Sequence, residues 1–102
     1  MRLFLLGAAL VATPAYADCS QAERDATHAF AVGAGQCVRA EAARLERSGE
    51  RAEAIATAAM VACHKHLSLL RNDCDGGLFA DIMDKRLREF AVSEVVKIRA
   101  KR

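Results

Sequence analysis

The stretch CVRAEAARLERSGERAEAIATAAMVAC, residues 37–63, decides the fold, because it begins and ends on a cysteine and turns near its middle. Ser48-Gly49 is a dipeptide typical of a turn. Two helices joined by such a turn run antiparallel, and residues at similar distances from the turn face each other. Cys37 precedes this turn by nearly the same length of chain as separates the turn from Cys63, so we expect these two cysteines to form a disulfide.

The other two cysteines, Cys19 and Cys74, lie farther out on either side of the same turn. Four cysteines allow three pairings. On continuous helices, pairing Cys19 with Cys37 or Cys63 with Cys74 would require Cα atoms roughly 27 or 16 Å apart to be joined, whereas a disulfide needs about 7 Å or less. The crossed pairing joins residues at unequal distances from the turn. The sequence therefore predicts nested bridges, Cys37–Cys63 and Cys19–Cys74.

Helical signals surround these cysteines. Ser20 and Glu23 form a capping-box pattern at the start of a first helix, whose continuity through Gly33–Gly35 the sequence leaves open. Residues spaced by three and four predict its buried seam: Cys19, Ala22, Ala26, Phe30, Gly33, Cys37 and Ala40. A second helix is expected from about Glu50 to about Arg71, with a seam of Ala52, Ile55, Ala59, Ala62, His66 and Leu69.

A third helix is expected over Leu78–Ala100, with Asp75 as its cap. Its apolar stripe comprises Phe79, Met83, Leu87, Phe90 and Ile98. The sequence therefore predicts an all-α fold, a disulfide-stapled antiparallel helical hairpin with a third helix packed on it.

The N-terminus has the order of a secretory signal peptide. Arg2 precedes an apolar run, Leu3–Ala12, and small residues flank position 16 in Ala15–Ala17. The run is shorter than the roughly 20 residues that span a bilayer. We expect residues 1–17 to be a cleaved signal peptide and residues 18–102 a single small helical domain, periplasmic or secreted, without stable membrane insertion.

Composition and motifs exclude several classes of function. Loss of Arg2 leaves 14 Lys and Arg, one fewer than the 15 in the whole chain, against 13 Asp and Glu, which does not indicate nucleic-acid binding. The sequence has no phosphate loop, nucleophile elbow or zincin motif. We therefore expect no enzyme and no cofactor.

The leading functional prediction is a non-catalytic binding or interaction module. Its partner would be an envelope protein or a second copy of the chain. Val92 and Val96 lie off the main stripe of the third helix and are the candidate contact residues, because apolar residues outside a core can mark interaction surfaces.

Two alternatives remain open. Cys63, His64 and His66 are of the residue types that bind copper or zinc. Cys63 and His66 share a helical face, whereas His64 points about 200° away from His66, and the site needs a free Cys63 thiolate. The other alternative is an acid-stress periplasmic chaperone, which would loosen when its 13 carboxylates become protonated at low pH.

Overall fold

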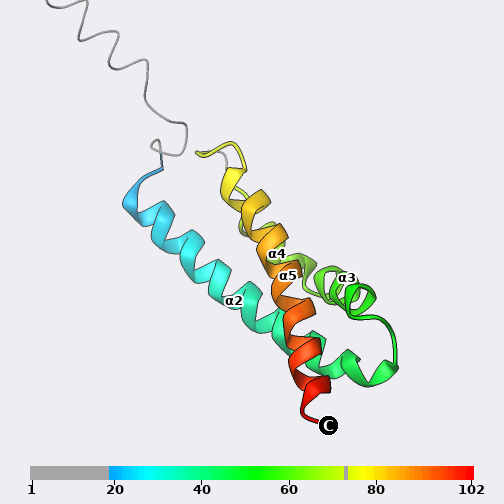
Figure 1. Cartoon of the computed structure of the whole chain (residues 1–102). Helices are drawn as coiled ribbons and strands as arrows, with labels where there is room; N and C mark the ends of the chain where they lie inside the picture. The colour runs from blue at the N-terminus through cyan, green and yellow to red at the C-terminus, as the bar shows by residue number, and fades with distance from the viewer. Residues whose placement is uncertain (1–18, 73) are drawn as a thin grey trace, which may run out of the picture.

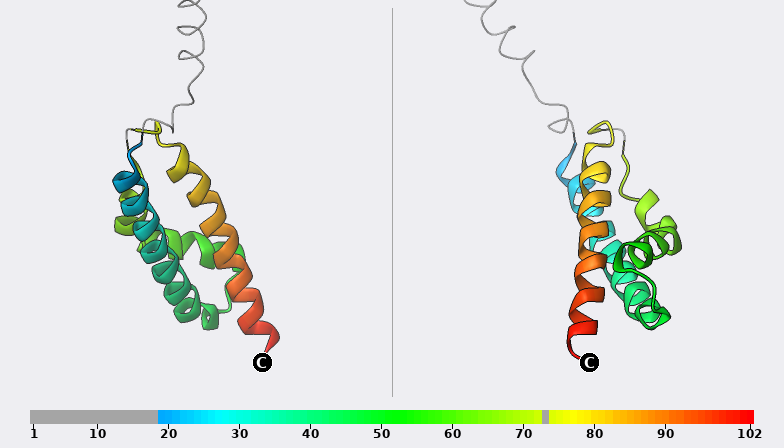
Figure 2. Two further views of the ribbon diagram at one scale, coloured as in Figure 1. Left: turned by 90° about the vertical axis from the view of Figure 1, so that its left-hand side faces the viewer. Right: turned by 45° about the vertical axis from the view of Figure 1, so that its right-hand side comes forward.

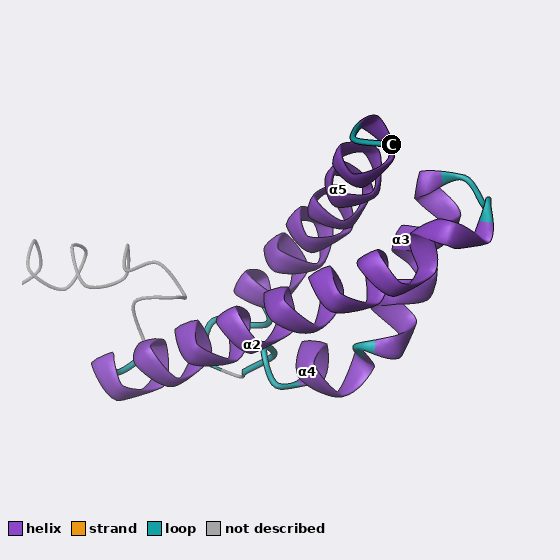
Figure 3. Cartoon of the chain, turned by 90° about the horizontal axis from the view of Figure 1, so that it is seen from below, coloured by secondary structure: helices purple, strands orange, loops and turns teal. Residues whose placement is uncertain are grey.

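The computed structural model describes residues 19–72 and 74–102, which consist of helices and the loops between them (Figures 1 and 3). The elements are α2 (Gln21–Leu45), the 3₁₀ helix η2 (Glu46–Ser48), α3 (Ala52–Ala62), α4 (His64–Ser68) and α5 (Leu78–Ala100). The predicted all-α fold is confirmed. The predicted signal peptide, residues 1–17, lies outside the described residues.

The hairpin forms at the predicted turn. The amide of Glu23 donates to Ser20 Oγ at 3.1 Å and the amide of Ser20 donates to Glu23 Oε1 at 2.9 Å, so the capping box starts α2. The helix then runs unbroken through Gly33–Gly35. At the other end, Gly49 has a φ of 81°, a left-handed conformation that glycine adopts without steric cost, and there the chain reverses.

The nested disulfide pairing is confirmed. Cys37 in the middle of α2 bonds to Cys63, with a Cα–Cα distance of 5.9 Å. Cys19, just before α2, bonds to Cys74 in the loop before α5, with a Cα–Cα distance of 5.0 Å. The inner bridge fixes α2 against the end of α3, and the outer bridge fixes the start of α2 near the start of α5.

The predicted seam of α2 is wrong by about one residue. Ala34, Val38 and Ala42 are fully buried, whereas Ala22, Ala26 and Ala40 are exposed. Alanine lies on every side of this helix, so the apolar residues do not clearly mark which face is buried. The N-terminal half of α2 also has little cover, since residues 21–30 are exposed apart from the half-buried Thr27.

The predicted second helix is divided in two. Cys63 leaves the helical conformation at φ −96° and ψ 16°, between α3 and α4. Leu70 is buried and Leu67 packs against the core, whereas the predicted seam residues His66 and Leu69 are exposed. The bend lies at the residue that is bonded to Cys37, and both α3 before it and α4 after it contact α2.

α5 begins at Leu78 as predicted, but its capping differs from the prediction. Gly77 is the N-cap, and Asp75 acts from two residues earlier. Asp75 Oδ1 accepts the amide of Gly77 at 2.8 Å, and Oδ2 accepts the amide of Phe79 at 3.2 Å. A side chain at Gly77 would collide with the guanidinium of Arg71.

α5, the third helix that the sequence predicts, packs along the hairpin and contacts both α2 and α3 (Figure 2). Its fully buried residues are Ala91 and Val95, and Leu87 is also buried. Phe79, Met83 and Phe90 of the predicted stripe pack against the core while partly exposed. Ala91, Val95 and Leu87 are therefore core residues of α5, and its larger aromatic and methionine side chains are only partly covered.

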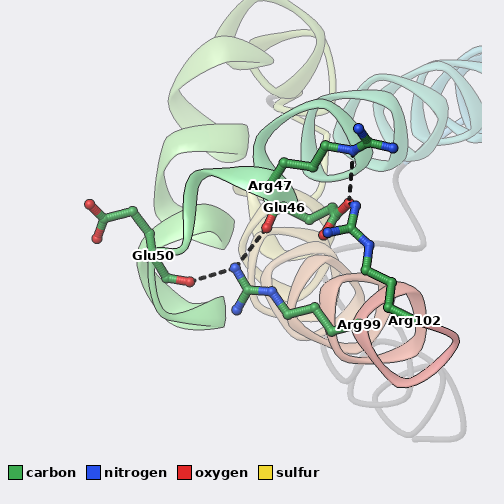
Figure 4. Close-up of polar contacts among 5 residues, drawn as sticks. All are labelled: Glu46, Arg47, Glu50, Arg99 and Arg102. Carbon is green, nitrogen blue, oxygen red and sulfur yellow. Dashed lines mark hydrogen bonds and ion pairs between the residues drawn. The ribbon is translucent and has the colours of Figure 1, made fainter.

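An arginine on α5 binds the backbone at the hairpin turn (Figure 4). Arg99 Nη2 donates to the carbonyl oxygens of Glu46 at 2.8 Å and Glu50 at 2.7 Å. The Glu46 carbonyl is at the C-cap of α2, where helix geometry leaves backbone acceptors without partners, and the Glu50 carbonyl lies in the loop before α3. The Glu46 carboxylate is buried and pairs with Arg47 and Arg102. Together these contacts fix the C-terminal end of α5 to the turn.

Within residues 19–72 and 74–102, no helix combines the length and the apolar character needed to cross a membrane.

Replacing Arg99 by methionine tests the link at the turn. The variant keeps an unbranched side chain but removes the donors, so we expect the free energy of unfolding to fall by about 1.5–3 kcal/mol in urea denaturation. Arg86→Met is the matched control, because Arg86 is exposed and makes no hydrogen bond or ion pair with the described residues. Equal losses in the two variants would contradict this role of Arg99.

The outer bridge can be tested by hydrogen exchange. In a variant with Cys19→Ser and Cys74→Ser, we expect the amides of residues 24–31 to lose protection by more than about tenfold, since such a bridge contributes about 2–4 kcal/mol. The amides of residues 38–45 should change much less, because the Cys37–Cys63 bridge remains. Equal loss of protection over all of α2 would show that the outer bridge acts on the whole fold.

Candidate functional site

A cleft of about 400 Å³ lies between the start of α2 and the start of α5. Nine residues line it: Cys19, Arg24, Thr27 and His28 at the α2 side, Asn72 and Asp75 in the loop, and Leu78, Phe79 and Ile82 on α5. Its volume falls within the range of small-molecule sites in proteins, about 300–1,000 Å³. Cys19 lines this cleft and is bonded to Cys74, so the outer disulfide ties the α2 side of the cleft to the loop before α5.

The α5 side of the cleft is apolar and open to water. Leu78 is 51% exposed and Ile82 is 42% exposed, and they are one helical turn apart on the same face. Phe79 lies between the cleft and the core. Contact of apolar side chains with water is unfavourable by roughly 25 cal/mol per Å², so a ligand that covered Leu78 and Ile82 would gain free energy.

The polar groups in the loop are bonded to one another. Asn72 Nδ2 donates to Thr27 Oγ1 at 3.2 Å, and Asn72 Oδ1 accepts the amide of Asp75 at 3.3 Å. Thr27 Oγ1 in turn donates to the Glu23 carbonyl at 2.8 Å. With both Asp75 oxygens bound to amides at the start of α5, these bonds connect the loop that lines the cleft to both α2 and α5.

Arg24 and His28 differ from those groups. They lie one turn apart on α2, and neither side chain makes a hydrogen bond or ion pair with residues in the described part of the chain. Their donors can therefore meet a bound molecule without breaking a contact of the described fold.

The predicted metal-ligating residues do not converge. The Cys63 sulfur is bonded to Cys37 and fully buried, whereas His64 and His66 are exposed on α4. His66 lies against Gly33 of α2, and His64 lines a wider hollow between α3, α4 and α5. In residues 19–72 and 74–102, no three His, Cys, Asp or Glu side chains are grouped so that they could hold a metal ion.

The two predicted contact residues have different surroundings. Val92 is half-buried and packs against the hydrophobic core. Val96 is 55% exposed on α5. Only Val96 therefore presents most of its side chain to the surface, and neither valine lines the cleft.

Sequence reasoning missed the cleft because its residues come from three separate segments. One available signal was the pair Leu78 and Ile82. They lie beside the predicted stripe of α5 and, unlike Val92, remain exposed after the helices pack. The position of Arg24 and His28 opposite them depends on how α2 and α5 pack, which no local pattern specifies.

A buried carboxylate links α5 to α2 outside the cleft. Arg39 Nε donates to Glu94 Oε1 at 2.9 Å, and Lys97 Nζ donates to Glu94 Oε2 at 3.2 Å. The hydrogen bond from Arg39, followed by the one from Lys97, holds the pKa of Glu94 below its ordinary value, although burial acts in the opposite direction. Arg39 also lies over the Phe90 ring, 6.0 Å from its centroid.

The lowered pKa of Glu94 predicts a loss of stability in acid. Its ionised form contributes stability above the unfolded-state pKa, about 4.3 for a glutamate, and this stability is lost as the pH falls through the lower native pKa. We expect the free energy of unfolding in urea to fall between pH 5 and pH 3, and to fall less in Glu94→Gln. The exposed Glu89→Gln is the control, and an unchanged pH dependence in Glu94→Gln would contradict the prediction.

The expected loss of stability in acid is one contribution to the loosening that an acid-stress chaperone requires. The chaperone alternative stays a prediction.

No protein-family model, curated protein or solved structure matches this chain. The candidate site therefore rests on the geometry of its own residues.

Proposed function

We propose that the chain is a non-catalytic binding protein of the periplasm or the cell exterior, which holds an apolar group of its ligand in the cleft between α2 and α5. The observation that carries the proposal is the partial exposure of Leu78 and Ile82 inside a cleft of about 400 Å³. Isolated exposed apolar residues are normal on protein surfaces, but two of them on the wall of a concave site favour binding.

The covalent structure supports the compartment. Two disulfides join all four described cysteines, and such bridges persist in oxidising compartments outside the cytosol. The signal-like order of residues 1–17 favours export by the same reasoning as above.

Rigidity supports a binding role as well. Three lining residues, Cys19, Asn72 and Asp75, are fixed by the Cys19–Cys74 bridge and by hydrogen bonds to α2 and α5. A site that is held open before its ligand arrives loses less conformational entropy on binding. A small helical domain of this kind can therefore bind without a large change in shape.

Nile red, an uncharged fluorescent probe, tests whether the cleft binds an apolar group independently of the charged residues that line it. We expect the full chain with intact disulfides to increase the fluorescence of the probe, and Ile82→Asp to weaken its binding at least about tenfold, because a carboxylate would be desolvated beside the apolar ligand. Val61→Asp is the control, since Val61 is 71% exposed and does not line the cleft.

Circular dichroism and urea denaturation should first show that both variants remain folded. No binding of the probe to the native chain, or equal weakening by Val61→Asp and Ile82→Asp, would contradict the proposed site.

A further inference from the structure

We propose that the ligand of this cleft is a single-chain amphiphile with an anionic head group, of which a fatty acid is the simplest example. The inference rests on the proposed function and adds the chemical class of the ligand. Its hydrocarbon chain would lie against Leu78, Phe79 and Ile82, and its head group would meet Arg24 and His28.

The size of the cleft suits a group as thin as an extended hydrocarbon chain. A helix of about ten residues, about 15 Å long and 10 Å across, occupies roughly 1,200 Å³. The cleft of about 400 Å³ holds about a third of that volume. A whole helix therefore does not fit inside the cleft, whereas a hydrocarbon chain or a single large side chain does.

The charges on the cleft wall favour an anion. Arg24 and His28 are the polar lining residues whose side chains make no hydrogen bond or ion pair with residues 19–72 and 74–102. Arg24 lies in the first turn of α2, where the aligned peptide dipoles favour a negative charge, and His28 lies one turn farther along the helix. An arginine beside a carboxylate can form charge-assisted hydrogen bonds.

The nearby carboxylates are occupied elsewhere. Asp75 also lines the cleft and keeps its negative charge, but both of its oxygens are engaged by the amides of Gly77 and Phe79 at the start of α5. On α2, Glu23 accepts the amide of Ser20, and Asp25 accepts the side-chain amide of Gln21. Neither Glu23 nor Asp25 lines the cleft. The guanidinium of Arg24 is therefore the charged group best placed to select the head group.

Three probes with hydrocarbon chains of the same length distinguish the contribution of the head group from that of the hydrocarbon chain. Dodecanoate is anionic, dodecanol is uncharged and dodecyltrimethylammonium is cationic, and each is used below the concentration at which it forms micelles. Binding is measured by displacement of Nile red from the full, oxidised chain. We expect dodecanoate to bind about tenfold or more tightly than dodecanol, and the cation to bind more weakly than either.

Variants assign the effect to Arg24. Arg24→Gln should reduce the affinity for dodecanoate to that for dodecanol while leaving dodecanol binding unchanged, and Arg24→Lys should restore part of the preference. Arg86→Gln is the control for a general loss of positive charge, because Arg86 is exposed on α5 and does not line the cleft. Ile82→Asp should weaken both probes.

Several results would overturn the inference. If dodecanoate and dodecanol bind equally tightly and Ile82→Asp weakens both, the preference for an anionic head group is rejected and the proposed binding cleft is retained. Nile red binding that neither probe displaces would reject a single-chain ligand. A dimer in sedimentation that Ile82→Asp dissociates would show that a second copy covers the cleft, and failure of Nile red itself to bind would reject the proposed function.

Discussion

The disulfide between Cys37 and Cys63 is the constraint on which the arrangement of helices depends. It joins the middle of α2 to the end of α3, and the sulfur of Cys63 lies in the core beside fully buried alanines. Side chains as small as these bury little apolar area each, so a core built from them gains less free energy per residue than one built from leucine. A covalent link between the two helices compensates for part of that difference by restricting the unfolded chain.

The bridge also explains which parts of the fold the sequence could predict. Similar distances from the turn at Gly49 were enough to pair Cys37 with Cys63, and the capping pattern at Ser20 was enough to start α2. The buried face of α2 could not be predicted, because alanine surrounds the helix and gives almost no apolar stripe. The bend at Cys63 was missed for another reason. No proline or glycine marks it, and it arises where the disulfide fixes the chain.

The candidate cleft is a property of the packed helices and not of any one segment. Arg24 and His28 on α2 line the same cleft as Leu78 and Ile82 on α5, although the rest of α2, α3 and α4 separate them in the sequence. Local periodicity could show that Leu78 and Ile82 share a helical face, but not that this face would remain uncovered. Val92 shows the converse, since it lies off the predicted stripe and still packs against the core.

The nested order of the two bridges has a consequence for cleavage by proteases. Both bridges lie within residues 19–74, and the outer one encloses the inner one. A single cut of the backbone anywhere between Cys19 and Cys74, including the exposed turn at Gly49–Arg51, leaves the two pieces covalently joined. The N-terminal hairpin can thus be cut once without coming apart. After a cut beyond Cys74, by contrast, the C-terminal piece of α5 is retained only by packing and by contacts such as that of Arg99 with the turn.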